Sequence, residues 1–397
     1  MISRGPSVMR LAQFVNGNPY KPEDFGDVGE PVIRIRQLLD PSADVELAPP
    51  PARPVWLADG DLVFSWSATL AVRFWYRGKA LLNQHLFRVD VGRGINRRWF
   101  VYVLEEAVHR LEPLMHGSAM THITLDMLRS VTVAVPSPET QVAMADYLDR
   151  ETVLIDRLIQ LKQKQAMALN ERLQATRNEW VRSQYDRWGR APLRRSLSRV
   201  EQGWSPQCDA AEAAVDEWGV IKTSAVTSGT FQPAENKALP PDIAPDRRWM
   251  IHDGDLLMAR GSGSAGSVGQ VAVAETDGRR LMLCDLVYRL VLLGSNCPQY
   301  FAAVLTAPIL RGYVEGAIRS DAGQTLKLRA DDVKVLPVPA APTPEQKTAW
   351  EALARVCVPI QEATARLDVQ VRLLQERRQA VITAAVTGEL KIPEVAA

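Results

Sequence analysis

A cluster of cationic side chains in the first quarter of the chain carries the clearest chemical signal in the sequence. Between Arg73 and Arg98 there are seven Arg or Lys residues and a single acidic residue, Asp90. Arg and Lys neutralise phosphates, and the planar Arg side chain can also hydrogen-bond the edge of a base. The cluster predicts a DNA-contacting surface; a solvated strand face whose aromatic side chains enter the core is the alternative interpretation. The candidate contacts are Arg73, Tyr76, Arg77, Lys79, Arg97 and Arg98.

A second, sparser group of candidates lies between residues 260 and 329. Acidic neighbours, among them Asp277, Asp331 and Asp332, dilute its positive charge. By charge alone this group favours DNA contact only weakly. Its members are Arg260, Ser262, Arg279, Arg280, Arg319, Lys327 and Arg329.

The segment Gly261–Gly266 satisfies the GxGxxG pattern of dinucleotide-binding loops. Such a loop must follow a strand and open a helix, whose N-terminus holds the pyrophosphate. Residues 255–260 read as a strand, but the alternation in residues 267–274 predicts a second strand instead of a helix. We therefore interpret the segment as a flexible turn able to approach a DNA strand, with a nucleotide-dependent enzyme as the alternative.

Other signatures of catalysis or metal binding are absent from the sequence. It contains no GxxxxGKS/T, HExxH or GxSxG motif, and its five histidines have no ligand spacing. The four cysteines lie far apart without a CxxC pair, which is typical of reduced thiols in a cytoplasmic protein. No catalytic residue, resident cofactor or metal site is predicted.

The elements that must position the candidate side chains occur twice in the chain. Residues 141–175 align with residues 346–380 without gaps, and 11 of the 35 positions are identical. Upstream, Asp-Gly-Asp-Leu at 59–62 recurs at 253–256, and the helical pattern at Phe100–His109 corresponds to that at Tyr300–Ile309. A repeat of this kind fixes the architecture, so we expect an internal duplication with divergent first parts.

Each copy ends in a long helical segment, from Gln141 to about Trp180 and from Gln346 to about Thr387. Thr343 and Gln346 have the spacing of a capping box, and Gly388 is placed as a C-terminal stop. Apolar residues at heptad spacing predict a coiled-coil seam, although packing of each helix on its own domain is the alternative. The seam residues are Leu148, Ile155, Leu158, Leu169, Ile360, Leu367, Leu374 and Val381.

The regions before the helices contain short β-like runs at residues 86–91, 131–135, 287–292 and 333–338. We expect an α+β fold of two globular α/β domains, each followed by a long helix. The two helices are expected to pair as an antiparallel coiled coil about a pseudo-twofold axis. The expected parts are a first domain at 1–136, a central helix at 137–181, a linker and second domain at 182–341, and a C-terminal helix at 342–397. The linker, 182–199, carries six Arg and one Asp.

Composition agrees with a globular protein. The 397 residues include 47 Lys and Arg against 46 Asp and Glu, and 46% are hydrophobic. The sequence has no run of 18 apolar residues and no apolar segment of signal-peptide type at its start. We expect a cytoplasmic protein without a membrane span.

This organisation resembles that of the specificity subunit of type I restriction–modification enzymes. Two divergent domains are each followed by Pro-x-Pro-Glu, a long helix and a Glu-Arg-(Arg/Leu)-Gln-Ala ending. The later copy fits best, at 339–346, 374–382 and 385–390, and the earlier copy keeps the pattern at 136–139 and 169–172.

The resemblance implies a non-catalytic, DNA-binding subunit of a restriction system. Each globular domain would be a target-recognition domain that reads one half of a bipartite, non-palindromic target in double-stranded DNA. Catalysis would belong to partners: two adenine-methyltransferase (M) subunits docked on the helices, and ATP-driven restriction (R) subunits. S-adenosylmethionine, ATP and Mg²⁺ would be bound by those partners. The alternatives are a coiled-coil interaction or regulatory protein without sequence-selective DNA binding, and a specificity chain that serves methylation alone.

Overall fold

The computed structural model describes residues 5–115, 122–208, 211–319 and 325–390. The chain divides into two compact units. Unit 1 comprises Met1–Gln163 together with Val369–Ala397, and unit 2 comprises Lys164–Asp368. This division differs from the four consecutive parts expected from the sequence, because each unit combines one globular domain with a portion of both long helices.

Unit 1 contains two four-stranded sheets. One is antiparallel with the order β1-β8-β5-β6, and the other has the order β3-β2-β7-β4 with β2 and β7 parallel. The strands are β1 (Ala12–Asn16), β2 (Glu30–Ile33), β3 (Glu46–Ala48), β4 (Trp56–Leu57), β5 (Leu62–Ser65), β6 (Ala71–Phe74), β7 (Ala80–Leu82) and β8 (Leu86–Val91). The helices are η1 (Val8–Arg10), η2 (Pro22–Asp24), α1 (Ile35–Leu39), α2 (Arg97–Leu111), η3 (Glu112–Met115) and α3 (Leu125–Ser130).

Unit 2 repeats this plan with additional short elements. Its main sheet has the order β10-β17-β13-β15, and its second sheet, β12-β11-β16, again contains a parallel pair, β11 and β16. The strands are β9 (Arg190–Pro192), β10 (Leu197–Gln202), β11 (Trp218–Ile221), β12 (Asn236–Ala238), β13 (Leu256–Ala259), β14 (Gly261–Ser262), β15 (Val271–Val273), β16 (Arg280–Met282), β17 (Val287–Leu292), β18 (Leu326–Lys327) and β19 (Pro337–Pro339). The helices are η4 (Leu193–Arg195), α5 (Ser224–Thr227), η5 (Arg247–Trp249), η6 (Ala265–Ser267), α6 (Pro298–Leu305), α7 (Pro308–Ala317) and α8 (Ala330–Lys334).

The repeated Asp-Gly-Asp-Leu motif builds the same turn in both units. Gly60 and Gly254 have φ angles of 87° and 89°, which favour glycine because a Cβ atom would be strained there. Asp61 accepts a hydrogen bond from the backbone N–H of Ala58, and Asp255 accepts one from that of residue 252. The motif therefore starts two equivalent central strands, β5 and β13.

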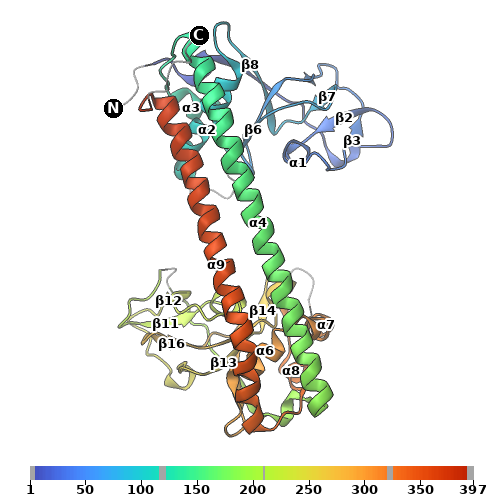
Figure 1. Ribbon diagram of the computed structural model, residues 1–397, viewed down its shortest axis with the longest axis vertical. Coiled ribbons are helices and arrows are strands. Elements are labelled where there is room, and N and C mark those ends of the chain that lie inside the picture. The colour runs from blue at the N-terminus through green and yellow to red at the C-terminus, as the bar shows by residue number, and fades with distance from the viewer. Residues whose placement is uncertain (1–4, 116–121, 209–210, 320–324, 391–397) are drawn as a thin grey trace. The chain divides into compact units, whose positions relative to one another are not determined.

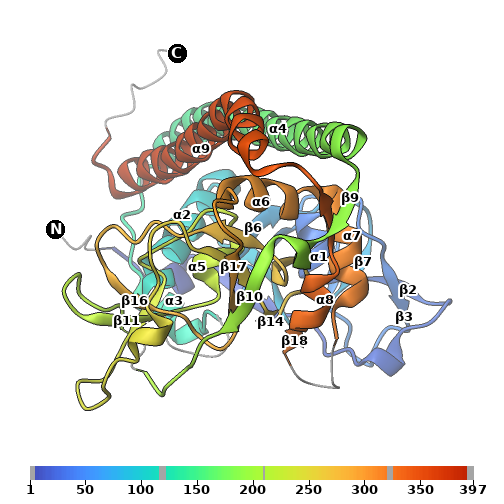
Figure 2. The same ribbon diagram turned by 90° about the horizontal axis from the view of Figure 1, so that it is seen from below.

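The two long helices are α4 (Pro138–Trp188) and α9 (Thr343–Thr387). The expected end of the central helix at residue 181 is wrong, because α4 continues for two further turns and stops before Gly189, whose φ angle is 71°. The expected linker at 182–199 is also wrong. Its residues form the end of α4, then β9, η4 and the start of β10, and β9 pairs with β19 (Figure 2).

Three further local expectations need correction. Residues 131–135 form no strand, because Val131 and Val133 bond to single groups of the N-terminal segment instead of a ladder. Residues 333–338 belong partly to α8 and partly to β19. The helix expected at Tyr300–Ile309 stops at Leu305 and resumes at Pro308, since proline disfavours a helical conformation in the residue before it.

The buried amides of Gln141 and Gln346 connect each long helix to a short helix of its own unit. Gln141 accepts a hydrogen bond from the N–H of Asn96 (2.7 Å), and Gln346 accepts one from that of Cys297 (2.9 Å). These N-cap residues show that α2 and α6 are equivalent with an offset of 201, one residue more than the sequence alignment gave. The capping box expected for Gln346 is wrong, because its amide donates instead to the carbonyl of Ala341 and to Asn296.

Both long helices contribute to the core of each unit (Figure 1). In unit 1, Ile382 and Val386 of α9 share a core with Met144 and Leu148 of α4. In unit 2, Leu173 of α4 packs with a group from the first half of α9, namely Leu353, Cys357 and Ile360. In each unit, therefore, the N-terminal part of one helix lies against the C-terminal part of the other.

The expected seam residues differ in burial. Leu148, Ile155, Ile360 and Leu367 are buried. Leu169, Leu374 and Val381 are half-buried. Leu158 is 46% exposed and is therefore not a core position of its unit.

Candidate nucleic-acid interface

The β14–β18 pair brings four of the predicted residues of unit 2 to one edge. Gly261 of β14 pairs with Lys327 of β18, so Ser262 and Lys327 lie on adjacent strands, Arg260 directly precedes β14 and Arg329 lies two residues after Lys327. Arg319 joins them, because it exchanges backbone hydrogen bonds with Lys327 at 2.9 and 3.0 Å. We call Arg260, Ser262, Arg319, Lys327 and Arg329 the basic edge of unit 2.

Arg260 is the anchored member of the basic edge. Its Nε donates to the hydroxyl of Tyr288 (3.0 Å), and its Nη1 donates to the carbonyl of Asp285 (3.2 Å). The guanidinium also lies over the Tyr288 ring, 5.7 Å from its centroid. A guanidinium has five N–H donors, so this half-buried side chain is held in place with donors left for a ligand.

The same edge of unit 1 is built from different side chains. Trp66 follows Leu62 by four residues as Arg260 follows Leu256, and its Nε1 donates to the carbonyl of Gln84 (3.0 Å), just as Arg260 donates to Asp285. The backbone match continues, since Ile123 N–H donates to Trp66 O (2.7 Å) and Leu328 N–H donates to Arg260 O (2.8 Å).

Polar groups lie around Trp66 that could not be identified from positive charge in the sequence. Ser67 forms a backbone bridge with His122, and its hydroxyl lies 3.0 Å from Nδ1 of His85. The His85 ring packs on Trp66 at a centroid distance of 5.7 Å. In the sequence, only the distance from the repeated Asp-Gly-Asp-Leu motif, which is the same for Trp66 and Arg260, would have indicated this region. We call Trp66, Ser67, His85 and His122 the aromatic edge of unit 1.

Three predicted contacts of unit 1 line one hollow of about 430 Å³. Tyr76, Arg97 and Arg98 contribute to its wall together with Phe74. Tyr76 is 68% exposed, so its ring is available to a ligand. Arg97 donates to the carbonyl of Gly60 and lies over the Phe74 ring at 5.6 Å.

Arg98 is held by the long helix. Its guanidinium forms ion pairs with Asp146 (2.6 Å) and Asp149 (2.7 Å) of α4. The hydrogen bond to Asp146, assisted by Asp149, raises the pKa of Arg98 despite partial burial. Because two carboxylates compensate its charge, Arg98 connects the domain to the helix and is not a free cation for a phosphate.

The other cations of the first cluster are dispersed and partly engaged. Arg77 lies over the Trp75 ring at 5.2 Å and Lys79 over the Trp56 ring at 3.7 Å. Arg73 on β6 is 54% exposed in its side chain and donates to a backbone carbonyl. The alternative interpretation thus fits the aromatic residues in part, since Trp75 is buried.

Arg279 and Arg280 lie apart from the basic edge, at the start of β16 in the second sheet. Arg279 forms an ion pair with Glu212 (2.9 Å) and donates to the carbonyl of Ala213 (3.1 Å), so it serves the packing of a loop. Arg280 is exposed. The structure therefore separates these two residues from the other candidates of unit 2.

The GxGxxG segment does not have the geometry of a dinucleotide loop. Gly261 and Ser262 form β14, and the chain continues through the three-residue 3₁₀-helix η6 into β15. The described residues contain no cluster of His, Cys, Asp or Glu able to hold a metal ion. Among the helices of the described residues, none is long and apolar enough to cross a membrane.

Part of this chain is similar to known proteins. Residues 45–170 match the model of the type I restriction modification DNA specificity domain. The specificity subunit of the Escherichia coli type I restriction enzyme EcoEI is 28% identical over 37% of this chain and 25% of its own length. This part of the chain is similar to type I restriction–modification specificity subunits.

Two further comparisons agree with this similarity. The specificity subunit of Escherichia coli EcoBI is 23% identical over 38% of this chain and 32% of its own length. The aligned part thus spans about a quarter to a third of either relative. A solved chain from a type I restriction–modification system shares the fold with a TM-score of 0.61 and 12% identity, covering 98% of the present chain and 100% of that chain.

Proposed function

We propose that this chain is the non-catalytic subunit that gives a type I restriction–modification complex its DNA sequence specificity. The observation that carries the proposal is the presence of two equivalent edges with different chemistry. The basic edge presents Arg260 and Lys327, whereas the aromatic edge presents Trp66 and His122 at matching backbone positions. Arg and Lys bond readily to guanine and phosphates, while aromatic and His side chains make stacking and single hydrogen-bond contacts. Two such readers would recognise a bipartite, asymmetric target.

The long helices would set the distance between the half-sites. The opposed contacts of α4 and α9 in each unit support an antiparallel coiled coil, which would relate two duplicated recognition domains by a pseudo-twofold axis. Half-sites about one helical turn apart, ~34 Å, present the same groove to both readers. Helices of 51 and 45 residues are long enough for such a ruler, since each residue adds about 1.5 Å.

Catalysis would belong to partner subunits. Two adenine methyltransferases would dock on the helices, and a translocating nuclease would join the full complex in the cytoplasm. Those subunits would bind S-adenosylmethionine, ATP and Mg²⁺. Exposed apolar residues on α4 of unit 1, namely Leu154 (62%), Leu158 (46%) and Leu161 (48%), support a protein partner there.

The same exposed residues favour the second candidate, a coiled-coil interaction protein that binds no specific DNA sequence. The decisive test is mapping of methylated adenine after co-expression with the methyltransferase gene next to this one. We expect methylation at a single split motif that disappears when this chain is omitted. Replacing one unit's recognition domain should change one half of the motif only. Unchanged methylation without the chain would leave the interaction protein as the better description, and the presence or absence of a nuclease gene nearby would identify a methylation-only system.

A further inference from the structure

The contact between the globular domain and the long helices is charged in unit 1. Besides the ion pairs of Arg98 described above, the hydroxyl of Tyr102 on α2 donates to Asp149 (2.6 Å) and lies 3.2 Å from the hydroxyl of Thr152. Both residues belong to α4, so one face of α2 is tied to that helix by side-chain hydrogen bonds and ion pairs.

A second set of polar contacts ties α2 to α9. Arg378 reaches Glu105 of α2 and Asp156 of α4, both at 3.0 Å. The neighbouring Glu106 is 3% exposed and accepts hydrogen bonds from Gln379 (2.9 Å) and from the hydroxyl of Thr383. We call these contacts, together with those of Arg98 and Tyr102, the polar clamp of unit 1.

The equivalent positions of unit 2 lack the side chains for the ion pairs of this clamp. The offset of 201 for α2 and α6, and of 205 for the long helices, identifies each counterpart. Arg98, Tyr102, Glu105, Asp149, Thr152 and Arg378 of unit 1 correspond to Gln299, Ala303, Thr306, Ala354, Cys357 and Leu173 of unit 2. None of these replacements carries a charge, whereas Asp146 corresponds to Glu351, which keeps one, and Thr383 corresponds to Asn178, which accepts a hydrogen bond from the N–H of Ile309 (2.7 Å).

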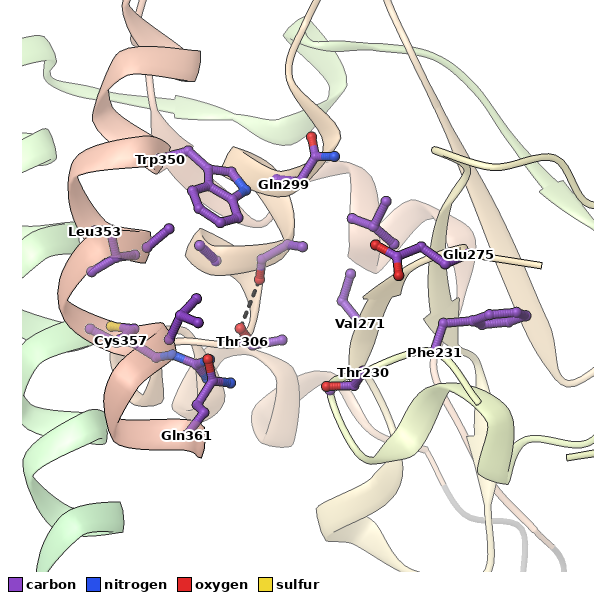
Figure 3. A pocket seen from close by; sticks show the side chains of 17 residues that line it. Thr230, Phe231, Val271, Glu275, Gln299, Thr306, Trp350, Leu353, Cys357 and Gln361 are labelled. Atoms are coloured by element: carbon purple, nitrogen blue, oxygen red, sulfur yellow. Dashed lines mark hydrogen bonds between the residues drawn. The ribbon is translucent and has the colours of Figure 1, made fainter. Parts of the chain in front are cut away.

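Where the clamp would lie, unit 2 has a hollow of about 340 Å³. Figure 3 shows Trp350, Leu353 and Cys357 of α9 on one side of this space and Val271 and Phe231 of the domain on the other, with Gln299 and Thr306 of α6 between them. The hydroxyl of Thr306, which replaces the carboxylate of Glu105, donates to the carbonyl of Ala302 in its own helix (2.7 Å) and so does not bridge to α9.

We propose that the polar clamp holds the first recognition domain rigidly against its helices, whereas the second recognition domain moves against α9 across the hollow. Moving the first domain would unpair Glu105 and Arg378, whose side chains are 14% and 23% exposed, and the buried Glu106, and unpairing buried charges is costly. Moving the second domain against α9 would strain the hydrogen bonds of Gln346, which have their counterpart at Gln141 in unit 1, but the ion pairs of the described residues include none between residues that line the hollow. Glu105, Glu106 and Arg378 are positioning residues under this proposal, and the part that concerns DNA reading rests on the proposed function.

Cysteine labelling tests the difference in mobility, because the chain supplies a matched pair of probes. Cys357 and its counterpart Thr152 are both 4% exposed. With Cys208, Cys284 and Cys297 replaced by Ala, one protein keeps Cys357, and a second carries Cys357→Ala with Thr152→Cys. A thiol reagent should modify Cys357 at least about tenfold faster than the thiol at position 152, since labelling reports local opening. Equal rates would overturn the proposal.

Two controls separate domain movement from other kinds of opening. Leu367→Cys, at a position that is 6% exposed on α9, reports separation of the long helices, and a rate as high as that of Cys357 would contradict the proposal. Raising the NaCl concentration from 0.1 to 1 M should accelerate labelling at position 152 by weakening the clamp, and should change the Cys357 rate less than about twofold. Ala303→Leu should fill the hollow and slow Cys357 labelling, while an unchanged rate with an unchanged melting temperature would count against the proposal.

Exchange of a clamp residue for its counterpart tests positioning. Arg378→Leu installs the residue type found at Leu173, so it should bring labelling at position 152 close to the Cys357 rate. In the methylation assay the same variant should relax the spacing between half-sites and leave their bases unchanged. Accelerated labelling without any split motif would refute the proposed function and leave the mobility intact. A split motif with equal labelling rates would support the proposed function and refute the difference in mobility between the two domains.

Discussion

Replacement of Gln346 by Met removes the bonds that join α9 to α6 and changes little else. The side chain is 2% exposed and makes three hydrogen bonds, to Cys297 N–H, Ala341 O and Asn296 Oδ1, at 2.8 to 3.0 Å. Met has a similar length and volume, so the cavity that a smaller residue would leave is largely avoided. The variant therefore measures what the buried amide contributes to the stability of unit 2.

The loss of stability follows from the partners left behind. A buried N–H without an acceptor costs about 1–3 kcal/mol, and each weakened acceptor costs less, so Gln346→Met should destabilise unit 2 by about 3 kcal/mol. For a unit of roughly 200 residues, about 2–4 °C per kcal/mol converts this to a fall in Tm of about 6–12 °C.

Calorimetry of the full chain measures the change, and two variants serve as controls. Gln141→Met breaks the equivalent set of three bonds in unit 1 and should lower Tm by a similar amount. Gln165→Met changes an exposed residue of α4 and should shift Tm by about 1 °C or less. A shift for Gln346→Met no larger than that for Gln165→Met would refute the reasoning that this amide couples domain to helix.

Three other substitutions test the seam, the basic edge and an ion pair. Ile360→Ala leaves a cavity at a buried seam position (8% exposed) and should lower the free energy of unfolding, measured in urea, by about 2–4 kcal/mol. A smaller loss would mean that α4 closes over the cavity. Lys327→Ala should weaken DNA binding and lower the slope of log K against log salt by about 1, while Lys237→Ala on β12 leaves the slope unchanged if the basic edge is the contact. Burial tends to raise the pKa of Glu201, but hydrogen bonds from arginines that include Arg289 outweigh it and leave the pKa lowered. This stabilisation is present above the ordinary Glu pKa of 4.5 and is lost as the pH falls through the folded-state pKa. Glu201→Gln should therefore flatten the acid side of a curve of unfolding free energy against pH. An unaltered acid side would argue against a stabilising Glu201–Arg289 ion pair.

Local patterns predicted the parts of the fold that depend on local interactions. The helical periodicity and the terminal Pro and Gly residues identified α4 and α9, and the runs at 86–91 and 287–292 became β8 and β17 with the same bounds. The segment at 131–135 shows the limit of alternation as a signal. Val131 and Val133 alternate as in a strand, yet their partners lie about 125 residues earlier and provide only single hydrogen bonds.

The candidate site was predicted less completely, because charge was used as the signal. Positive charge selected Arg260 and Lys327, which the structure brings together, but also Arg98 and Arg279, whose charges are compensated by acids distant in the sequence. It could not select Trp66, which carries no charge and is recognised only by its place after the repeated turn.

The conserved and divergent parts of the two units have different physical roles. Hydrogen bonds to backbone groups depend on the path of the chain, so both units keep the Asp-Gly-Asp turn and the buried Gln that fix it. Side-chain pairs can change together without altering that path. Arg260 of unit 2 takes the place of Trp66 of unit 1, and either side chain donates to the same carbonyl position. Leu173 and Thr306 of unit 2 together take the places of the paired Arg378 and Glu105 of unit 1. A duplicated framework therefore leaves the surface of each domain, and its polar contacts with the long helices, free to diverge separately.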